Sequence, residues 1–131
     1  MKRGLKMTIS MTKTHPGVSI ESGYPITIST LAKAADTSVH IVRNYMAEGL
    51  ISAHSRTKGG YWLFDKTALN RLTLIRTAMV AGLRLQDIKP LLSALDLPDH
   101  RQINREKRLI DVQIVQNHQR LTQLSQLLEK L

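Results

Sequence analysis

The 131 residues suffice for one modest domain plus an appendage, and a hydrophobic content of 42% is that of a soluble globular protein. A formal net charge of +9 favours a polyanionic partner over a merely well-solvated basic surface, because Lys and Arg release counterions when they approach phosphates. The absence of cysteine excludes disulfides, thiolate metal sites and cysteine nucleophiles.

The chain begins with residues 1–23, which mix Lys, Thr, Ser and Gly without helical or alternating periodicity. We expect a flexible basic arm, in which Lys2, Arg3, Lys6 and Lys13 can add loose phosphate contacts. An upstream start without any role is an equal alternative. The arm lacks the continuous apolar run of a secretory signal, and no stretch of the chain reads as a membrane span. The simplest location is the cytoplasm, with no membrane partner.

A helix-turn-helix follows the arm. Its first helix is predicted to begin after residue 28, capped by Ser29 or Thr30, with an inward face of Leu31, Ala34 and Ala35. Asp36 and Thr37 make the turn into a second helix, which is capped by Ser38 and ended by Gly49. Two short helices joined in this way form the motif.

The second helix and the hairpin after it are the predicted DNA-reading element. In the helix, Val39, Val42 and Met46 recur at helical spacing and form an inward face. A basic, glycine-rich tip, residues 56–60, then separates two segments of strand character, 50–55 and 61–64. Such a tip can lay positive charge on a phosphate backbone. Trp62 is assigned to the core.

The candidate DNA contacts lie on the outward face of the second helix and in the hairpin: Ser38, His40, Ile41, Arg43, Asn44, Tyr45, Arg56, Thr57, Lys58, Gly60 and Tyr61. Arg43 is favoured as a phosphate contact; the alternative, a bidentate base contact, would discriminate by about 1–3 kcal/mol. His40 and Asn44 have edges suited to bases, and Ile41 either touches a thymine methyl or belongs to the core. Tyr45 and Tyr61 either donate hydroxyls to phosphates or simply pack.

Two further helices are predicted before the last segment. The first begins after Asp65 and ends at Gly82, and Lys66, Arg71 and Arg76 lie opposite its apolar face of Ala68, Leu69, Leu72, Ile75 and Met79. The second covers residues 85–95, where Pro90 should kink the helix or delay its start. Leu97 and Pro98 interrupt the chain, and Asp99 can cap the next helix.

The last segment, from about residue 100 to residue 131, is one long amphipathic helix with a heptad seam. A helix of about 30 residues is roughly 45 Å long, too long for a small domain to bury. We therefore predict a homodimeric antiparallel coiled coil, although the helix could instead fold back on its own domain. Asn117 can fix the register of the seam. The candidate dimerisation residues are Ile103, Ile110, Ile114, Asn117, Leu121, Leu124, Leu128 and Leu131.

These residues resemble the mercury-resistance regulator (MerR) family of winged-helix transcription factors over roughly residues 26–131. The family's opening is similar to residues 28–35, its recognition helix to residues 38–45 and its turn to residues 49–50. The runs 38–43 and 59–65 are most similar to the coregulator branch of the family. Arg43 and Tyr45 match family positions that contact the backbone or brace the helix, whereas Asn44 stands where many relatives have an aromatic residue.

The resemblance implies a mainly α fold: a winged helix-turn-helix DNA-binding domain with a small β-hairpin wing, followed by a long C-terminal dimerisation helix in an antiparallel coiled coil. It also implies promoters whose −35 and −10 elements are widely spaced and become distorted. We expect a flexible arm over residues 1–23, the DNA-binding domain over 24–97 and the coiled coil over 98–131.

The predicted function is that of a sequence-specific transcriptional regulator that acts as a dimer at a promoter, as a repressor or coregulator. Mercury-sensing relatives bind the ion through cysteines, and this chain has none, so we expect no thiolate metal sensing. The expected partners are double-stranded promoter or operator DNA, a second copy, and RNA polymerase or a related regulator. Two alternatives are a coiled-coil adaptor that pairs with another regulator and a recombination directionality factor.

Catalysis and cofactor binding are not expected from this sequence. The five histidines are scattered without ligand spacing, and neither a phosphate-binding glycine loop nor a nucleophile motif is present. We therefore predict no enzyme activity, no cofactor and no metal.

Overall fold

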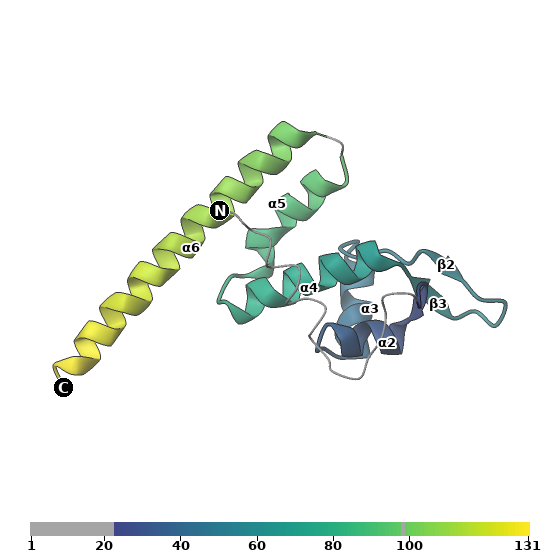
Figure 1. Cartoon of the computed structure of the whole chain (residues 1–131), viewed down its shortest axis with the longest axis horizontal. Helices are drawn as coiled ribbons and strands as arrows, with labels where there is room; N and C mark the ends of the chain where they lie inside the picture. Colours follow the sequence, from purple (N-terminus) through teal and green to yellow (C-terminus); the bar gives the residue numbers. More distant parts are fainter. Residues whose placement is uncertain (1–22, 98) are drawn as a thin grey trace. The chain divides into compact units, whose positions relative to one another are not determined.

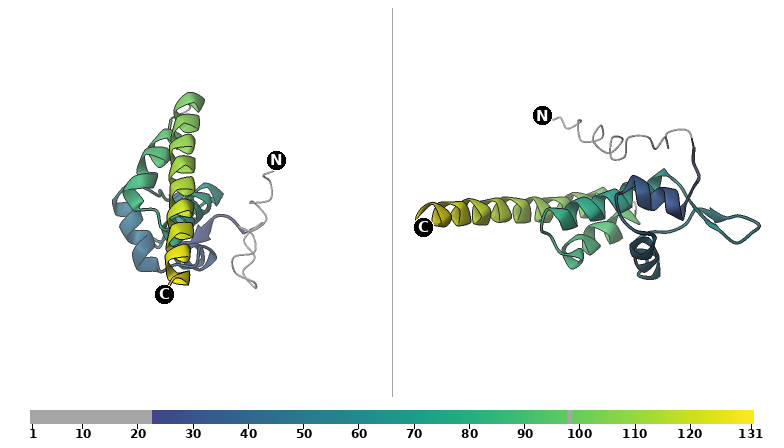
Figure 2. Two further views of the ribbon diagram at one scale, coloured as in Figure 1. Left: turned by 90° about the vertical axis from the view of Figure 1, so that its left-hand side faces the viewer. Right: turned by 90° about the horizontal axis from the view of Figure 1, so that it is seen from below.

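The computed structural model describes residues 23–97 and 99–131, which form two compact units, one up to Thr77 and one from Ala78 to Leu131 (Figures 1 and 2). Helices dominate both, and one small antiparallel sheet accompanies them. The predicted mainly α fold with a hairpin wing and a long C-terminal helix is confirmed. The predicted basic arm lies outside the described residues, apart from Gly23.

The sheet of the first unit has three short strands, β1 (Ile26–Thr27), β2 (Ser55–Arg56) and β3 (Trp62–Phe64), with β3 in the middle. Ile26 pairs with Phe64, and Ser55 pairs with Leu63, both in antiparallel register. The sequence did not predict β1, because a strand of two residues has no periodicity to detect.

The first helix, α2 (Ile28–Ala34), begins earlier than expected. Its cap is Thr27, whose Oγ1 accepts the backbone N–H of Thr30 at 3.2 Å, so the predicted caps Ser29 and Thr30 were wrong. Several hydroxyl side chains lie within four positions and each can cap a helix, so the pattern alone could not choose between them. The predicted inward face is confirmed: Leu31 is fully buried, and Ala34 and Ala35 are buried beside it.

The core of the first unit is apolar and continuous between the sheet and the helices. Leu31, Val42, Phe64, Leu72 and Ile75 are all completely shielded from solvent. Leu50 and Ile51 are buried in the connection between helix and wing, not in a strand. The predicted strand over residues 50–55 therefore shrinks to β2, because these two side chains serve the core rather than the hairpin.

The helix α4 (Lys66–Val80) begins as predicted, since Asp65 Oδ1 accepts the N–H of Ala68 at 3.1 Å. Ala68, Leu69, Leu72 and Ile75 are buried on its predicted apolar face, and Met79 is half-buried. Gly82 follows the helix with φ of +99°, a conformation that glycine adopts without steric cost.

The second unit pairs two helices, α5 (Leu85–Leu95) and α6 (His100–Glu129), which lie side by side (Figure 1). Pro90 lies inside α5, and the helix still starts at Leu85, so the expected delay was wrong. The missing N–H of Pro90 leaves the carbonyl of Gln86 without its helical partner, and Gln86 is exposed, so water can satisfy that carbonyl. Asp99 caps α6 as predicted.

The seam of α6 divides into two parts. Ile103, Ile110 and Asn117 are half-buried and recur on one face, which indicates that this stretch packs against α5. Leu121, Leu124 and Leu128 continue the same face but are 64%, 51% and 57% exposed. The helix thus folds back on its own chain only along its first half, and the seam beyond has no cover in the described residues.

The start of α5 depends on Asp87, whose Oδ2 accepts the backbone N–H of Arg84 at 2.9 Å. This hydrogen bond to the ionised carboxylate lowers the pKa of Asp87 below the ordinary value of an aspartate. A carboxylate with a lowered pKa stabilises the fold above its ordinary pKa, and the contribution disappears as the pH falls through the lowered value. We expect Asp87→Asn to lower the melting temperature at pH 7 and to lower it less at an acidic pH at which the carboxyl is protonated, as measured by calorimetry. An equal loss at both pH values would contradict this role of the charge.

Candidate nucleic-acid interface

The helix α3 (Val39–Ala47) is the recognition element that the sequence predicts, and both of its ends are closed locally. Ser38 Oγ accepts the N–H of Ile41 at 3.1 Å. At the other end, Gly49 has φ of +77°, and the N–H of Leu50 donates to the carbonyl of Tyr45 at 2.9 Å. Such a left-handed glycine stop ends the helix within one residue and redirects the chain.

The side chains of α3 divide into an inward and an outward set. Val42 is fully buried, whereas His40, Arg43 and Asn44 are exposed, as the sequence predicts. Ile41 is half-buried, which is compatible with either predicted role, a contact with a thymine methyl or a place in the core. Tyr45 is only 7% exposed, so its ring packs in the core, and a contact between its hydroxyl and phosphate stays a prediction.

Two of the candidate base-reading residues are linked on the outer face of α3. Asn44 Nδ2 lies 3.5 Å from His40 Nε2, one helical turn away. A neutral imidazole with an unprotonated Nε2 can accept from that amide, although 3.5 Å makes this a long and weak contact between two exposed side chains. We therefore treat His40 and Asn44 as one polar surface rather than as two independent contacts.

The tip of the wing is a closed turn between β2 and β3. The N–H of Thr57 donates to the carbonyl of Tyr61 at 2.9 Å, and the Thr57 hydroxyl accepts the N–H of Tyr61 at 3.1 Å. Gly60 has φ of +88°, and its N–H donates to the carbonyl of Thr57 at 2.9 Å. Thr57 therefore shapes the turn, while Lys58 and Tyr61 are exposed on it.

The wing also carries a stacked pair that the sequence did not predict. The guanidinium carbon of Arg56 lies 4.1 Å from the centre of the Trp62 ring, a cation–π contact. Trp62 is 36% exposed, so its assignment to the core was wrong. The register explains why: β1 pairs with Leu63 and Phe64 only, so Trp62 lies beyond the edge of the core and opposite Arg56.

Arg71 of α4 supports the connection between α3 and the wing. The sequence placed it on the outer face, yet it is half-buried, and its Nε donates to the Leu50 carbonyl at 2.9 Å. Ala68 and Ile75, three residues before and four residues after Arg71, are buried. This proximity to the apolar stripe is the one sequence signal for its inward position.

We expect Arg71→Met to lower the free energy of unfolding by about 1–3 kcal/mol, because the Leu50 carbonyl loses a charged donor while the alkyl stem is retained. Urea denaturation measures this change. The matched control is Lys66→Met, an exposed residue of the same helix, which should change stability by less than about 0.5 kcal/mol. Equal effects of the two substitutions would refute the assigned role of Arg71.

The described residues include no helix that is long and apolar enough to cross a membrane. Among the same residues, no three His, Asp or Glu side chains gather in one place where a metal ion could be held. What the first unit does present is a polar recognition helix beside a wing with exposed Arg56 and Lys58.

Comparison with known proteins identifies the class. Residues 26–95 match the family model of the MerR HTH family regulatory proteins. The transcriptional regulator MerD of Acinetobacter calcoaceticus is 49% identical over 73 residues, which are 56% of this chain and 60% of MerD. The chain therefore spans about three fifths of that curated relative.

Solved structures agree with this assignment. The transcription regulator PbrR691 from Ralstonia metallidurans CH34, in complex with lead(II), is 32% identical, with a TM-score of 0.56 and coverage of 80% of this chain and 81% of that chain. The regulator HiNmlR, which lacks the sensor domain and is bound to promoter DNA, shares the fold at 24% identity, with a TM-score of 0.64 and coverage of 79% and 77%. These relatives are transcriptional regulators, not enzymes. The chain belongs to the MerR family of helix-turn-helix DNA-binding transcriptional regulators.

Proposed function

We propose that this chain is a coregulator or repressor that binds promoter DNA as a dimer and does so without thiolate metal sensing. The observation that supports this proposal most directly is the exposure of His40, Arg43 and Asn44 on a helix whose opposite side is buried in the core. Promoter binding by HiNmlR and the similarity to MerD support the proposal.

Each element of the first unit has a role in this proposal. Arg43 contacts a phosphate and positions α3, while the His40–Asn44 surface meets base edges in the major groove. Arg56 and Lys58 of the wing contact the adjacent DNA backbone. The Trp62 ring holds the Arg56 guanidinium in place from one face, and the N–H groups at the edge of the guanidinium can donate to a phosphate.

Dimer formation depends on the uncovered part of α6. Ile114, Leu121, Leu124 and Leu128 are each more than half exposed, on a helix of which only the first half packs one face against α5. A heptad-spaced apolar face of this kind is covered by a second helix in a coiled coil. We propose a second copy in antiparallel orientation, which brings two recognition helices to two half-sites.

The test is footprinting and titration on the DNA upstream of the gene, at several salt concentrations. Arg43→Ala should weaken binding to all sequences alike and reduce the salt slope by about 1, because one phosphate contact is lost. Asn44→Ala should instead reduce the discrimination against single-base changes, with a loss of about 1–3 kcal/mol at one position.

Lys107→Ala is the matched control, because it removes one exposed positive charge from α6 instead of α3. It should leave the footprint in place. Protection that survives Arg43→Ala with an unchanged salt slope would refute the assigned role of Arg43, and absence of any protected site would refute the regulator itself.

A further inference from the structure

A second stripe of regularly spaced side chains runs along α6. Its members are separated by alternating steps of four and three residues, as in a heptad repeat: Arg101, Arg105, Arg108, Val112 and Val115. We call this the arginine–valine stripe. All of its side chains are exposed, and the two valines are 52% and 55% exposed.

The stripe lies opposite the face of α6 that packs on α5. Arg101, Arg108 and Val115 each precede by two residues a member of the half-buried face, namely Ile103, Ile110 and Asn117. Two residues correspond to about 200° around an α-helix. A dimer formed through the seam therefore leaves the arginine–valine stripe open.

The three guanidinium groups form no ion pair within the described part of the chain. In residues 23–97 and 99–131, no carboxylate lies within ion-pair distance of Arg101, Arg105 or Arg108. Glu106 does not help, because it is half-buried on the other face and accepts a hydrogen bond from Gln102 at 3.0 Å. Like charges three or four residues apart destabilise a helix, and so do positive charges near its N-terminus. An anionic partner would remove this penalty.

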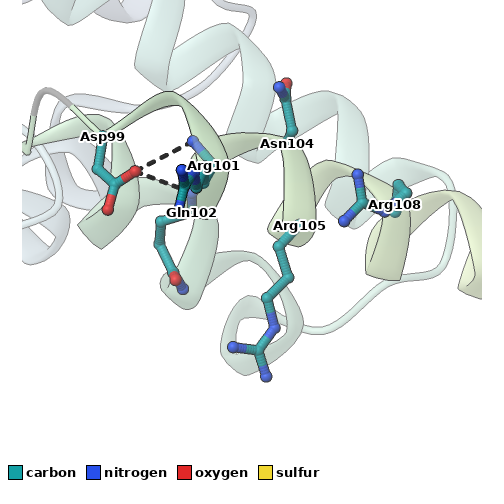
Figure 3. A pocket seen from close by; sticks show the side chains of 6 residues that line it. All are labelled: Asp99, Arg101, Gln102, Asn104, Arg105 and Arg108. Carbon is teal, nitrogen blue, oxygen red and sulfur yellow. Dashed lines mark hydrogen bonds between the residues drawn. The ribbon is translucent and has the colours of Figure 1, made fainter.

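The arginines also line an open hollow of about 560 Å³, together with Asp99, Gln102 and Asn104 (Figure 3). Asp99 is already engaged, since its Oδ1 accepts the N–H groups of Arg101 and Gln102. Arg105 and Asn104 extend to different sides of the helix in Figure 3. Arg101, Arg105 and Arg108 lie on successive turns of α6, so their charges are distributed along the helix, which suits an extended partner more than a single small anion.

We propose that the arginine–valine stripe docks an acidic amphipathic helix of another protein. The heptad spacing matches a helix, the arginines match acidic side chains, and the exposed valines match an apolar contact that nucleic acid would not need. Contact of the stripe with the same stripe of a second copy is disfavoured, because both carry the same three positive charges. This docking site does not depend on the DNA-binding proposal.

The test uses the full chain and a labelled helical peptide of about three heptads, with Glu opposite the arginines and Leu opposite the valines. Fluorescence anisotropy at physiological salt should show binding, and a peptide with Lys in place of Glu should not bind. Arg105→Glu should weaken binding by about tenfold or more, since like charges then face each other. Val112→Gln with Val115→Gln should weaken it without any change of charge.

Lys107→Glu is the matched control, with the same reversal of an exposed charge on a residue outside the stripe, and it should change binding less than about twofold. An equal loss for Lys107→Glu and Arg105→Glu would overturn the site in favour of diffuse charge. Loss in the arginine variant alone would indicate a surface for any polyanion, including DNA, and would also overturn it. A changed oligomeric state of the valine variant would assign the face to self-association instead.

Discussion

Replacing both Leu121 and Leu128 with Asp should separate the proposed dimer into monomers and weaken its binding to promoter DNA by about 100-fold or more, because the two proposed half-sites are then no longer bound together. Both side chains are more than half exposed in the chain itself, so the substitution should spare its own packing. Analytical ultracentrifugation measures the oligomeric state, and a DNA titration measures affinity.

The control for this variant keeps the charge and moves it off the seam. Gln119→Asp with Gln126→Asp places the same two charges two residues earlier, on the opposite side of α6. This protein should remain a dimer with undiminished affinity. A dimer that persists with Asp at positions 121 and 128 would show that the interface lies elsewhere.

Phe64→Ala should cause the largest loss of stability among single core substitutions in the first unit. Phe64 is the largest of the fully buried side chains, and its strand holds the centre of the sheet. Truncation of a buried Phe typically lowers the free energy of unfolding by about 3–5 kcal/mol, through lost transfer energy and a residual cavity. Since a small domain has only about 5–15 kcal/mol in total, this one substitution should remove a large share of the stability of the protein.

Scanning calorimetry measures the effect of Phe64→Ala as the change in the melting temperature and in the enthalpy of unfolding. The control is Leu63→Ala, which truncates the half-buried neighbour of Phe64 in the same strand. This variant should show a clearly smaller loss of the free energy of unfolding. A loss below about 1 kcal/mol for Phe64→Ala would contradict the central place of this ring in the core.

The recognition helix could be predicted from the sequence because both of its boundaries are local. Ser38 and Gly49 act on backbone groups within a few residues, and Val42 reports the buried face directly. The long helix was equally accessible, since its periodicity extends over about 30 residues and Asp99 marks its start. Helix caps and helical periodicity depend only on residues close together in the chain, so the sequence can predict them.

The wing and its support could not be predicted to the same degree, because they depend on contacts between distant residues. Arg71 and Leu50 are 21 positions apart, and no local sequence pattern predicts the hydrogen bond between them. The exposure of Trp62 follows from where β1 ends, and β1 is too short to be recognised. Tertiary packing of α4 on the connection after α3 determines the first feature, and strand pairing determines the second, whereas hydrophobicity alone favoured a buried tryptophan.

The candidate DNA contacts show the same division. His40, Arg43 and Asn44 follow from helical spacing, and all three are exposed. For Tyr45 the sequence left packing and a phosphate contact equally open, and its burial could only be seen once the helix was placed on a core. Thr57 needed the hydrogen bonds of the turn before its structural role became evident.

The stacked pair in the wing has a practical consequence for spectroscopy. Trp62 is the single tryptophan of the chain, so the indole emission of the whole protein originates at the wing. Its ring lies against the Arg56 guanidinium and is partly exposed to water. The emission should therefore change when the Arg56 guanidinium moves or when the water at the ring is displaced. Stopped-flow fluorescence of the unlabelled protein can therefore test the proposed contact of the wing with DNA separately from the proposed contact of α3.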